Sequence, residues 1–529
     1  MTMLTSINPT TEEVLAQVTP LSRQEVRKVI ETVAGGYMTW REVPLHERLA
    51  ACRRLIRLIA DERETIARIL ALEQGKPICE ALVAEILPVL GALRHLTRIA
   101  PRVLSDKRAP HELILLAHKR STYRREPYGV VSVIAPWNYP FSVALPEIAA
   151  ALVAGNTVVY KPAPNSILIG QKIDELLGRG GYPRTAFSTV FVTDEVAPEL
   201  TSHPAVRKIV FTGSTNVGRL VMQSAAGHVA PVVLELGGKD PAVVASDAHL
   251  ARAARGVVWG AMFTSGQVCA SIERVYVERP IAEQFIAACV ELVRALRVGD
   301  PLQADTDIGP LTTAEQLATV SAHVEDAVSK GAKVLAGGHR LQGRGFFYAP
   351  TVLTNVDHTM KVMTEETFGP VLPIMVVDSL EEAIRLANDS PYGLSAYGWT
   401  RSKATAERLM RELQAATVII NDGPATWGEP AAPWGGYKQS GIGRTRATWG
   451  LLEMVQLKYT SLDPGRKPDS PWWFPYDQGA RGLAAEAVPL LFARHWWGKL
   501  PPLLRLVRNR RFVANAHWLA IFRNLHKLF

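Results

Sequence analysis

Apolar residues recur at spacings of three and four over residues 22–72, which is the period of amphipathic helices. The positions that carry this period include Leu55, Leu58, Ile59, Ile66, Ile69 and Leu70. From about residue 128 the pattern changes to short apolar runs separated by helical stretches, and the runs lie at 129–135, 156–160, 188–192, 208–211 and 241–244. Alternation of this kind is typical of a parallel α/β sheet. A second alternating series, from 250 to about 420, predicts another α/β unit.

The last part of the chain has a different pattern. Residues 463–476 are rich in Pro, Asp and Trp, which predicts a linker. Further on, apolar positions recur mostly every three, four or seven residues and predict one helical stripe made of Leu504, Val507, Ala514, Trp518, Ile521, Leu525 and Leu528. Basic residues flank the stripe, and no acidic residue follows Glu486. This is typical of a helix on an anionic membrane surface, and packing on the body or on a neighbouring subunit is the alternative.

Length and charge narrow the class of protein. A chain of 529 residues is expected to form two or three domains. Its 47% hydrophobic and 21% charged residues exclude a disordered chain, a fibrous repeat and a polytopic membrane protein. The net charge is +9, but residues 463–529 hold 11 Lys and Arg against 4 Asp and Glu. The excess therefore belongs to the C-terminal tail, which carries no nucleic-acid readout motif, so no nucleic-acid partner is expected.

Cysteine usage and the N-terminus predict the compartment. Four cysteines in no CxxC spacing exclude a disulfide scaffold, and they indicate a reduced environment (Cys52, Cys79, Cys269 and Cys289). The first residues lack a basic segment followed by an apolar one, so no signal peptide is expected. No uncharged apolar run approaches the roughly 18 residues of a membrane span. We therefore expect a cytoplasmic protein whose tail attaches to the cytoplasmic face of a membrane.

A phosphate-binding turn is the first candidate for chemistry. Residues 208–218 read as a strand, a turn with Gly213 and Ser214, and a helix that contains Gly218. Backbone N–H groups at such a helix N-terminus suit a pyrophosphate. The G-x-G-x-x-G fingerprint is absent, however, and glycines also close strand-to-helix turns without any ligand. Both interpretations remain open on this segment alone.

Cys269 and Glu235 are candidates for covalent and acid–base chemistry. Cys269 follows Gly266, Gln267 and Val268, and small neighbours allow the close backbone approach that a nucleophile needs. A lone cysteine is also often just a small buried apolar residue. Glu235 lies between two leucines, where burial would raise its pKa and make it a general base, although a capping or lysine-paired glutamate is equally compatible.

Together these motifs resemble the aldehyde dehydrogenase superfamily over roughly residues 7–460. The motifs occur in the family's order and are Asn8-Pro9, Ala135-Pro-Trp-Asn138-Tyr-Pro, Gly155-Asn156 leading to Lys161-Pro-Ala, Phe211-Thr-Gly-Ser214, Leu234-Glu-Leu-Gly-Gly-Lys239, Gly266-Gln-Val-Cys269, Glu365-Glu366-Thr-Phe368-Gly-Pro370, Asn388-Asp-Ser-Pro-Tyr-Gly-Leu394 and Pro433-Trp-Gly-Gly-Tyr-Lys-Gln-Ser-Gly441. Their joint specificity is high for the family and much lower for any one substrate.

The resemblance implies an α/β fold with a Rossmann-like cofactor domain, an α/β catalytic domain, a small β oligomerisation arm and a helical C-terminal extension. The implied boundaries are 1–108 with 128–235 for the cofactor domain, 236–440 for the catalytic domain, 109–127 with 441–462 for the arm, and 463–529 for the extension. It also implies a homodimer or homotetramer and NAD as cofactor, with NADP also possible.

The resemblance further implies a role for each motif residue. Cys269 would attack the aldehyde carbon, Asn138 and the backbone N–H of Cys269 would form the oxyanion hole, and Glu235 would activate water for thioester hydrolysis. The implied cofactor contacts are Trp137, Lys161, Gly213, Ser214, Gly218, Glu366 and Phe368. One Cys, one Asn and one Glu suffice for this chemistry, and no His/Cys/Glu group has local metal-ligand spacing, so no metal is expected.

Two departures from the family pattern matter. Pro164 stands where many NAD-preferring members carry a glutamate that repels a 2′-phosphate, which predicts weak discrimination between NAD and NADP with a lean to NAD. Thr448 stands where some members carry a second glutamate that assists proton relay.

The residues expected around the substrate are apolar or aromatic and favour an apolar aldehyde: Tyr139, Val143, Pro146, Phe263, Val268 and Ala270. The alternatives are a CoA-acylating enzyme, which typically lacks the glutamate at the Glu235 position, and a catalytically silent membrane-associated scaffold on the same fold.

Overall fold

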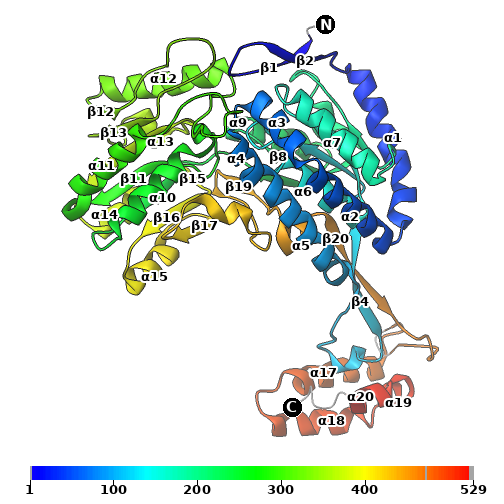
Figure 1. The fold of residues 1–529 in the computed structure, drawn as a ribbon. Coiled ribbons are helices and arrows are strands. Elements are labelled where there is room, and N and C mark those ends of the chain that lie inside the picture. Colours follow the sequence, from blue (N-terminus) through cyan, green and yellow to red (C-terminus); the bar gives the residue numbers. More distant parts are fainter. Residues whose placement is uncertain (1–2, 471–472, 524–529) are drawn as a thin grey trace. The chain divides into compact units, whose positions relative to one another are not determined.

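The computed structural model describes residues 3–470 and 473–523 (Figure 1). The chain divides into two compact units. The first unit comprises Met1–Val103 and Pro127–Val455, and the second comprises Leu104–Glu126 and Gln456–Phe529. These units cut the chain at different places from the four-part division expected from the sequence, and the assignment of cofactor, catalytic and oligomerisation roles to those parts stays a prediction.

Helices open the first unit, as the periodicity predicted. They are α1 (Arg23–Glu42), α2 (Leu45–Asp61) and α3 (Arg63–Gln74). Helix α1 begins at a capping box, in which the Ser22 side chain accepts from the Glu25 N–H and the Glu25 carboxylate accepts from the Ser22 N–H. The apolar stripe of each helix is buried, with Ile30, Leu55 and Ile66 fully inaccessible. The predicted helical region is confirmed.

A six-stranded sheet forms one half of the first unit, in the order β19-β9-β8-β5-β6-β7. Its strands are β5 (Val130–Ile134), β6 (Thr157–Lys161), β7 (Phe187–Thr189), β8 (Val206–Thr212), β9 (Val232–Glu235) and β19 (Gly441–Ile442). All pairs are parallel except β19 with β9. The helices between successive strands from β5 to β9 are α6 (Ala144–Ala154), α7 (Ile167–Gly180), the short α8 (Glu199–Ser202) and α9 (Thr215–Ala226). Because parallel strands end on one edge, this arrangement gathers the loops that follow β5, β8 and β9.

A seven-stranded sheet forms the other half, in the order β12-β13-β14-β11-β10-β16-β17. Its strands are β10 (Asp240–Val244), β11 (Ile272–Glu278), β12 (Lys333–Ala336), β13 (Thr351–Thr354), β14 (Val371–Val377), β16 (Ser395–Trp399) and β17 (Thr417–Ile420). Only β12 is antiparallel to its neighbour. Helices α10 (Leu250–Met262) and α11 (Arg279–Arg294) pack on it. Two α/β halves confirm the predicted fold class.

The second unit combines a small sheet with the C-terminal helices. The sheet has the order β20-β4-β3, with β3 (Lys107–Arg108), β4 (Arg120–Pro127) and β20 (Val455–Leu462). The helices are α17 (Gln478–Phe492), α18 (Leu500–Leu506), α19 (Arg510–Asn515) and α20 (Trp518–Arg523), and Figure 1 draws them beside one another at the red end of the chain. They share one apolar core with the segment before β4, made of Ile114, Leu483, Leu490, Leu506, Phe512, Ala516 and Ile521.

The single amphipathic helix predicted over residues 504–529 is wrong for the described residues. Helix α18 ends at Leu506, and the Asn509 side chain caps α19 by accepting from the Phe512 N–H at 3.2 Å. Within the predicted stripe, Leu504 is 57% exposed whereas Ile521 is 8% exposed, so the stripe does not form one buried face. Leu525 and Leu528 lie outside the described residues. The apolar positions that predicted one helix are distributed over three separate helices. The buried residues of these helices pack within the second unit, which is nearer to the alternative of packing than to a free amphipathic helix.

Residues 463–470 and 473–476, within the predicted linker, form no helix or strand. Within the described ranges, every helix is too short or too polar to cross a bilayer.

Candidate active site

A cavity of about 510 Å³ lies in the first unit, at the edge where β5, β8 and β9 end. Asn138 reaches it from the loop after β5, Glu235 from the last residue of β9, and Cys269 from the loop before β11. Glu366 and Phe368 line the same cavity. The structure therefore brings together the three residues predicted to be catalytic, although they come from segments far apart in the sequence.

The loop before Cys269 has an unusual backbone. Thr264, Ser265 and Gly266 all have positive φ, at 54°, 56° and 73°. Such a conformation costs about 1–3 kcal/mol at each non-glycine residue and persists only where other contacts hold it. The Thr264 N–H donates to the Glu80 carboxylate at 2.9 Å, and the Ser265 hydroxyl donates to the carbonyl of Gly309 at 2.9 Å. These contacts fix the loop that presents Cys269.

Gly266 in that loop cannot be replaced without movement. A Cβ at this position would lie 2.0 Å from the carbonyl oxygen of Gly369, in the segment that carries Phe368. The glycine thus serves two purposes, because it adopts the left-handed conformation and lets two cavity-lining backbones approach each other. This is the close approach that the small residues before Cys269 predicted.

Asn138 is held from both ends. Its side-chain amide donates to the carbonyl of Gln267 at 3.0 Å, which leaves the second N–H of the amide for a ligand. Its backbone carbonyl accepts from the ammonium of Lys76, which is ion-paired with Glu85. The other oxygen of Glu85 accepts from the Ser142 N–H at 2.6 Å. Lys76 and Glu85 escaped the sequence analysis because charged residues in helical stretches usually face solvent.

The surroundings of the Cys269 thiol favour its protonated form. Burial raises its pKa, and the nearby carboxyl groups of Asp240, Glu366 and Glu235 raise it further. The thiol must therefore lose its proton as it attacks the substrate.

Glu235 has the features of a general base. Its side chain is buried, and neither carboxyl oxygen has a hydrogen-bond partner among the described residues. Burial raises its pKa well above the usual range, Glu147 raises it further, and Arg444 lowers it. A buried carboxyl group without partners is costly, and such groups concentrate at functional sites. The orphaned carboxyl group favours a general base over the capping or lysine-paired alternatives.

Glu366 and Phe368 form another wall of the cavity. Glu366 accepts from the Gly238 N–H at 3.0 Å, and burial raises its pKa to about 8, with Glu273 adding to the shift. The buried Glu273 holds this segment by accepting from the N–H groups of Thr367 at 2.7 Å and Phe368 at 2.8 Å. The ring of Trp137 meets that of Phe368 edge to face, with 5.5 Å between centroids. The two aromatic rings suit contact with a nicotinamide ring, and the carboxyl group suits the hydroxyl groups of its ribose.

The predicted phosphate turn also lies at the cavity. Gly213 and Ser214 line it, and Ser214 is the N-cap of α9, so the positive end of a twelve-residue helix faces this side. Gly218 does not line the cavity, and a Cβ there would lie 2.4 Å from Leu236, so this glycine lets α9 pack closely. Lys161, the last residue of β6, is buried outside the cavity lining. The residues present fit a dinucleotide.

The remaining walls are apolar. The predicted pocket residues Tyr139, Val143, Phe263, Val268 and Ala270 all line the cavity, whereas Pro146 lines a separate small cavity instead. The sequence analysis missed a set of apolar wall residues, namely Val83, Leu87, Trp259, Trp427 and Trp434. All of them except Trp259, which lies on α10, are far from Cys269 in the sequence. Trp427 meets Trp434 edge to face at 5.2 Å between centroids. The sequence signal for this wall is the number of tryptophans in the chain, which is 12.

Glu147 was also missed. It is buried, lines the cavity, and burial raises its pKa to about 8 while Arg446 lowers it. Thr448 does not line the cavity, so the second carboxyl group near Glu235 comes from α6 rather than from the C-terminal motif.

Comparisons with known proteins identify the family. The model of the aldehyde dehydrogenase family matches residues 2–460. The 4,4'-diapolycopene aldehyde oxidase of Methylomonas sp is 38% identical over 479 residues, which cover 90% of this chain and 89% of that protein. The NAD+ complex of an aldehyde dehydrogenase from Bacillus cereus has a TM-score of 0.84 and 33% identity, covering 88% of this chain and 94% of its own. An NADP-dependent enzyme from E. coli has the same TM-score and identity, with 87% and 95% coverage.

Proposed function

Since the chain belongs to the aldehyde dehydrogenase family and is an NAD(P)-dependent enzyme, we propose that Cys269, Asn138 and Glu235 carry out its oxidation of an aldehyde to the carboxylic acid. One observation carries this assignment: the three side chains line one cavity, and the carboxyl group of Glu235 is buried there without a partner. Neither the CoA-acylating alternative nor the silent scaffold is favoured, because a buried water-activating base has no use in either.

The first half-reaction forms and oxidises an adduct on Cys269. The sulfur attacks the aldehyde carbon as its proton is lost to solvent, and the Asn138 amide and the Cys269 N–H stabilise the developing oxyanion. The oxidised nicotinamide supplies the hydride acceptor when bound. Loss of hydride from the tetrahedral carbon restores the carbonyl and leaves a thioester on Cys269.

The second half-reaction hydrolyses the thioester. Glu235 removes a proton from water, whose oxygen attacks the thioester carbon, and the Asn138 amide again stabilises the oxyanion. The carbon–sulfur bond then breaks, the carboxylic acid leaves, and the sulfur is reprotonated. The raised pKa of Glu235 suits this task, because a stronger base removes the proton of water more readily.

The cofactor would be held by residues on one side of the cavity. Gly213 and Ser214 would bind its phosphates, Glu366 the nicotinamide ribose, and Phe368 and Trp137 the ring, with Lys161 and Gly218 completing the site as the family resemblance implies. Pro164 removes a repulsive carboxylate, so we expect NAD to be preferred only weakly over NADP. The kcat/KM values for the two cofactors measure this, and a strong NADP preference would contradict it.

The substrate is proposed to be a long apolar aldehyde. The aromatic walls formed by Trp259, Trp427 and Trp434 support this, and a relative is named as an oxidase of a polyene aldehyde. Each CH₂ group buried against these walls contributes about 0.8 kcal/mol, which is roughly a fourfold gain in kcat/KM. A panel of straight-chain aldehydes should show this rise with length, and a preference for short or acidic aldehydes would contradict it.

A matched pair of tryptophan variants sharpens that test. Trp259 lines the cavity and packs on Phe263 with 4.8 Å between ring centroids, whereas Trp449 is 59% exposed and does not line it. Trp259→Ala should lower kcat/KM for long aldehydes more than for short ones, and Trp449→Ala should change neither.

The second unit is proposed to bind an anionic membrane surface. Support comes from the basic excess of residues 463–529 and from large apolar side chains that are more than half exposed there: Trp473, Phe474, Tyr476, Val488, Phe492, Trp497, Leu504 and Leu519. Trp and Phe beside Arg suit the lipid headgroup region. Flotation with anionic liposomes should therefore recover the full chain, less so at high salt.

Two glutamate variants test the membrane surface directly. Phe492→Glu removes an exposed ring of the extension, and Val229→Glu changes an equally exposed residue of the first unit. The first should reduce liposome binding and the second should not. If the wild-type chain stays unbound at low salt, the membrane proposal is wrong.

Self-association is proposed for the small sheet. Leu457, Tyr459 and Leu462 on β20 are all more than half exposed, and apolar side chains on a strand are unfavourable in water. Light scattering should give a dimer or tetramer, and Leu457→Glu should lower the mass. A monomeric wild type would contradict this.

A further inference from the structure

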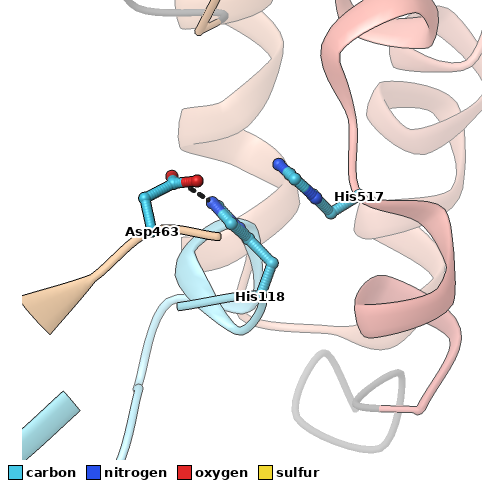
Figure 2. A group of neighbouring side chains, drawn as sticks. All are labelled: His118, Asp463 and His517. Carbon is cyan, nitrogen blue, oxygen red and sulfur yellow. Dashed lines mark hydrogen bonds and ion pairs between the residues drawn. The ribbon is translucent and has the colours of Figure 1, made fainter. Parts of the chain in front are cut away.

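His118, Asp463 and His517 meet in the second unit, in segments that contain none of the motifs that carry the proposed chemistry (Figure 2). His118 lies in the turn before β4, Asp463 directly follows β20, and His517 directly precedes α20. One ring nitrogen of each histidine and one carboxylate oxygen lie within 4.8 Å of one another. Three separate segments thus present three metal-ligand atoms to one point.

The contacts inside this group are close. The Nε2 atom of His118 lies 3.0 Å from the Oδ2 atom of Asp463. The imidazole rings of His118 and His517 are stacked with 3.8 Å between centroids and 4° between planes. The His118 side chain is only 12% exposed, whereas Asp463 is 45% exposed, so the group has one covered and one open side.

We propose that His118, Asp463 and His517 form a binding site for a divalent transition-metal ion of the zinc class. Two imidazole nitrogens and one carboxylate oxygen are ligands that Zn²⁺ and Co²⁺ accept, whereas Mg²⁺ and Ca²⁺ prefer oxygen alone. With three protein ligands, the exposed side leaves a fourth position for water. Nothing in the proposed aldehyde chemistry requires this ion.

Binding the ion requires a rearrangement within the group. Zinc ligands lie about 2.0–2.2 Å from the metal and hence roughly 3.5 Å from one another, so the 3.0 Å contact between His118 and Asp463 must widen. The His517 ring must also turn out of its stack on His118 to aim a nitrogen at the metal. His517 can supply most of this movement, because it lies between two short helices, α19 and α20. The metal would replace the direct contact between His118 and Asp463.

Neighbouring cations weaken the site without excluding it. The ammonium of Lys119 lies 4.0 Å from the same Asp463 oxygen, and Arg466 and Lys467 also act on His517 electrostatically. Each opposes a divalent ion, and the single carboxylate offsets only part of that repulsion. We therefore expect weaker binding than at a buried four-cysteine zinc site.

The ion would fasten the extension to the arm. His118 and Asp463 belong to the ends of the small sheet, whereas His517 belongs to the helices that follow residue 477. A ligand that binds only the docked arrangement stabilises it by mass action. Zn²⁺ should thus protect the extension from cleavage.

The test is a metal titration of the full chain in a Cys269→Ala background, which removes the cavity thiol as a competing ligand. Co²⁺ is the probe, because its visible absorption reports ligand geometry and number. We expect one equivalent with a visible band, and loss of that band in His517→Gln and in His118→Gln. The matched control is His495→Gln, which changes an exposed histidine of the extension stacked on Trp497.

Proteolysis provides a second measurement, which is needed if a histidine variant loses the Co²⁺ band only because its packing is disturbed. Proteolysis of the extension, with and without Zn²⁺, should slow in the wild type and in His495→Gln but remain unchanged by Zn²⁺ in His517→Gln. If the wild-type chain takes up no Co²⁺, or if the histidine variants keep the band and the protection, then the group is only an ion pair with stacked rings and the proposal is wrong.

Discussion

The cavity of the first unit and the core of the second are built in opposite ways. The cavity depends on a few buried polar groups, namely Glu235 at the end of β9 and the Lys76–Glu85 ion pair that holds the backbone of Asn138. The core of the second unit instead shares its burial among seven apolar residues. This difference predicts which property a single substitution in each region should change. Changes in the cavity should alter rates by orders of magnitude, and changes in the second unit should alter stability and binding instead.

The largest effect is expected at Cys269. Cys269→Ser should lower turnover on the order of a thousandfold or more, because a serine hydroxyl does not ionise near neutral pH. Cys79→Ser is the control, since Cys79 is an exposed cysteine that should be replaceable without loss. Steady-state assays of both variants measure this. Comparable loss in the two, or activity in Cys269→Ser, would contradict the assignment of the nucleophile.

Gly266→Ala should come next. The added Cβ would meet the Gly369 carbonyl at 2.0 Å and oppose a φ of 73°, so the loop must shift. Misplacement of a reacting group by about 1 Å can cost on the order of a hundredfold in rate. Gly178→Ala is the control, because a Cβ at that position on α7 meets no atom within 4 Å. Equal kcat/KM values in the two variants would show that the left-handed loop does not position Cys269.

Glu147→Gln should shift a pH profile rather than abolish activity. Glu235 works as a base when deprotonated, so thioester hydrolysis falls as the pH drops through its raised pKa. Removing the negative charge of Glu147 lowers that pKa and moves the acid limb to lower pH. The pH dependence of kcat measures this, with Glu31→Gln, an exposed change on α1, as the control. If the acid limb of the kcat profile moved to higher pH instead, the predicted effect of Glu147 on the pKa of Glu235 would be wrong.

The smallest effect on catalysis is expected from Phe512→Ala. This change opens a hole in the core of the second unit, where large-to-small substitutions cost about 3–5 kcal/mol. Thermal unfolding and proteolysis should show a loosened extension, whereas kcat/KM for a water-soluble aldehyde should stay near that of the wild type. A matched loss of turnover would mean that the two regions are not as separable as we infer.

The same contrast explains what could be predicted from the sequence. Cys269, Glu235 and Asn138 stand in motifs that resemble those of the aldehyde dehydrogenase family, so roles could be proposed for them without coordinates. The Lys76–Glu85 pair that holds the Asn138 carbonyl has no such signal, because its role depends on a contact across the fold. The tryptophans of the cavity wall and Glu147 are brought there by tertiary structure alone.

The C-terminal extension shows what sequence periodicity cannot predict. Its apolar spacing predicted one helix, but a new helix begins at the Asn509 N-cap. The spacing of apolar residues carries no information about such a cap. The His118–Asp463 contact spans 345 residues, so no local spacing could reveal it. Periodicity therefore predicted the elements of the first unit well and the tertiary arrangement of the second poorly.

The most direct test of the central claim is a rapid-mixing measurement on Glu235→Gln. If Cys269 forms the thioester and Glu235 is needed mainly to hydrolyse it, this variant should release about one equivalent of reduced cofactor per site in a burst and then turn over slowly. Mass spectrometry should find the acyl group on Cys269. Normal steady-state turnover, or neither a burst nor a trapped acyl-enzyme, would contradict the division of roles between Cys269 and Glu235.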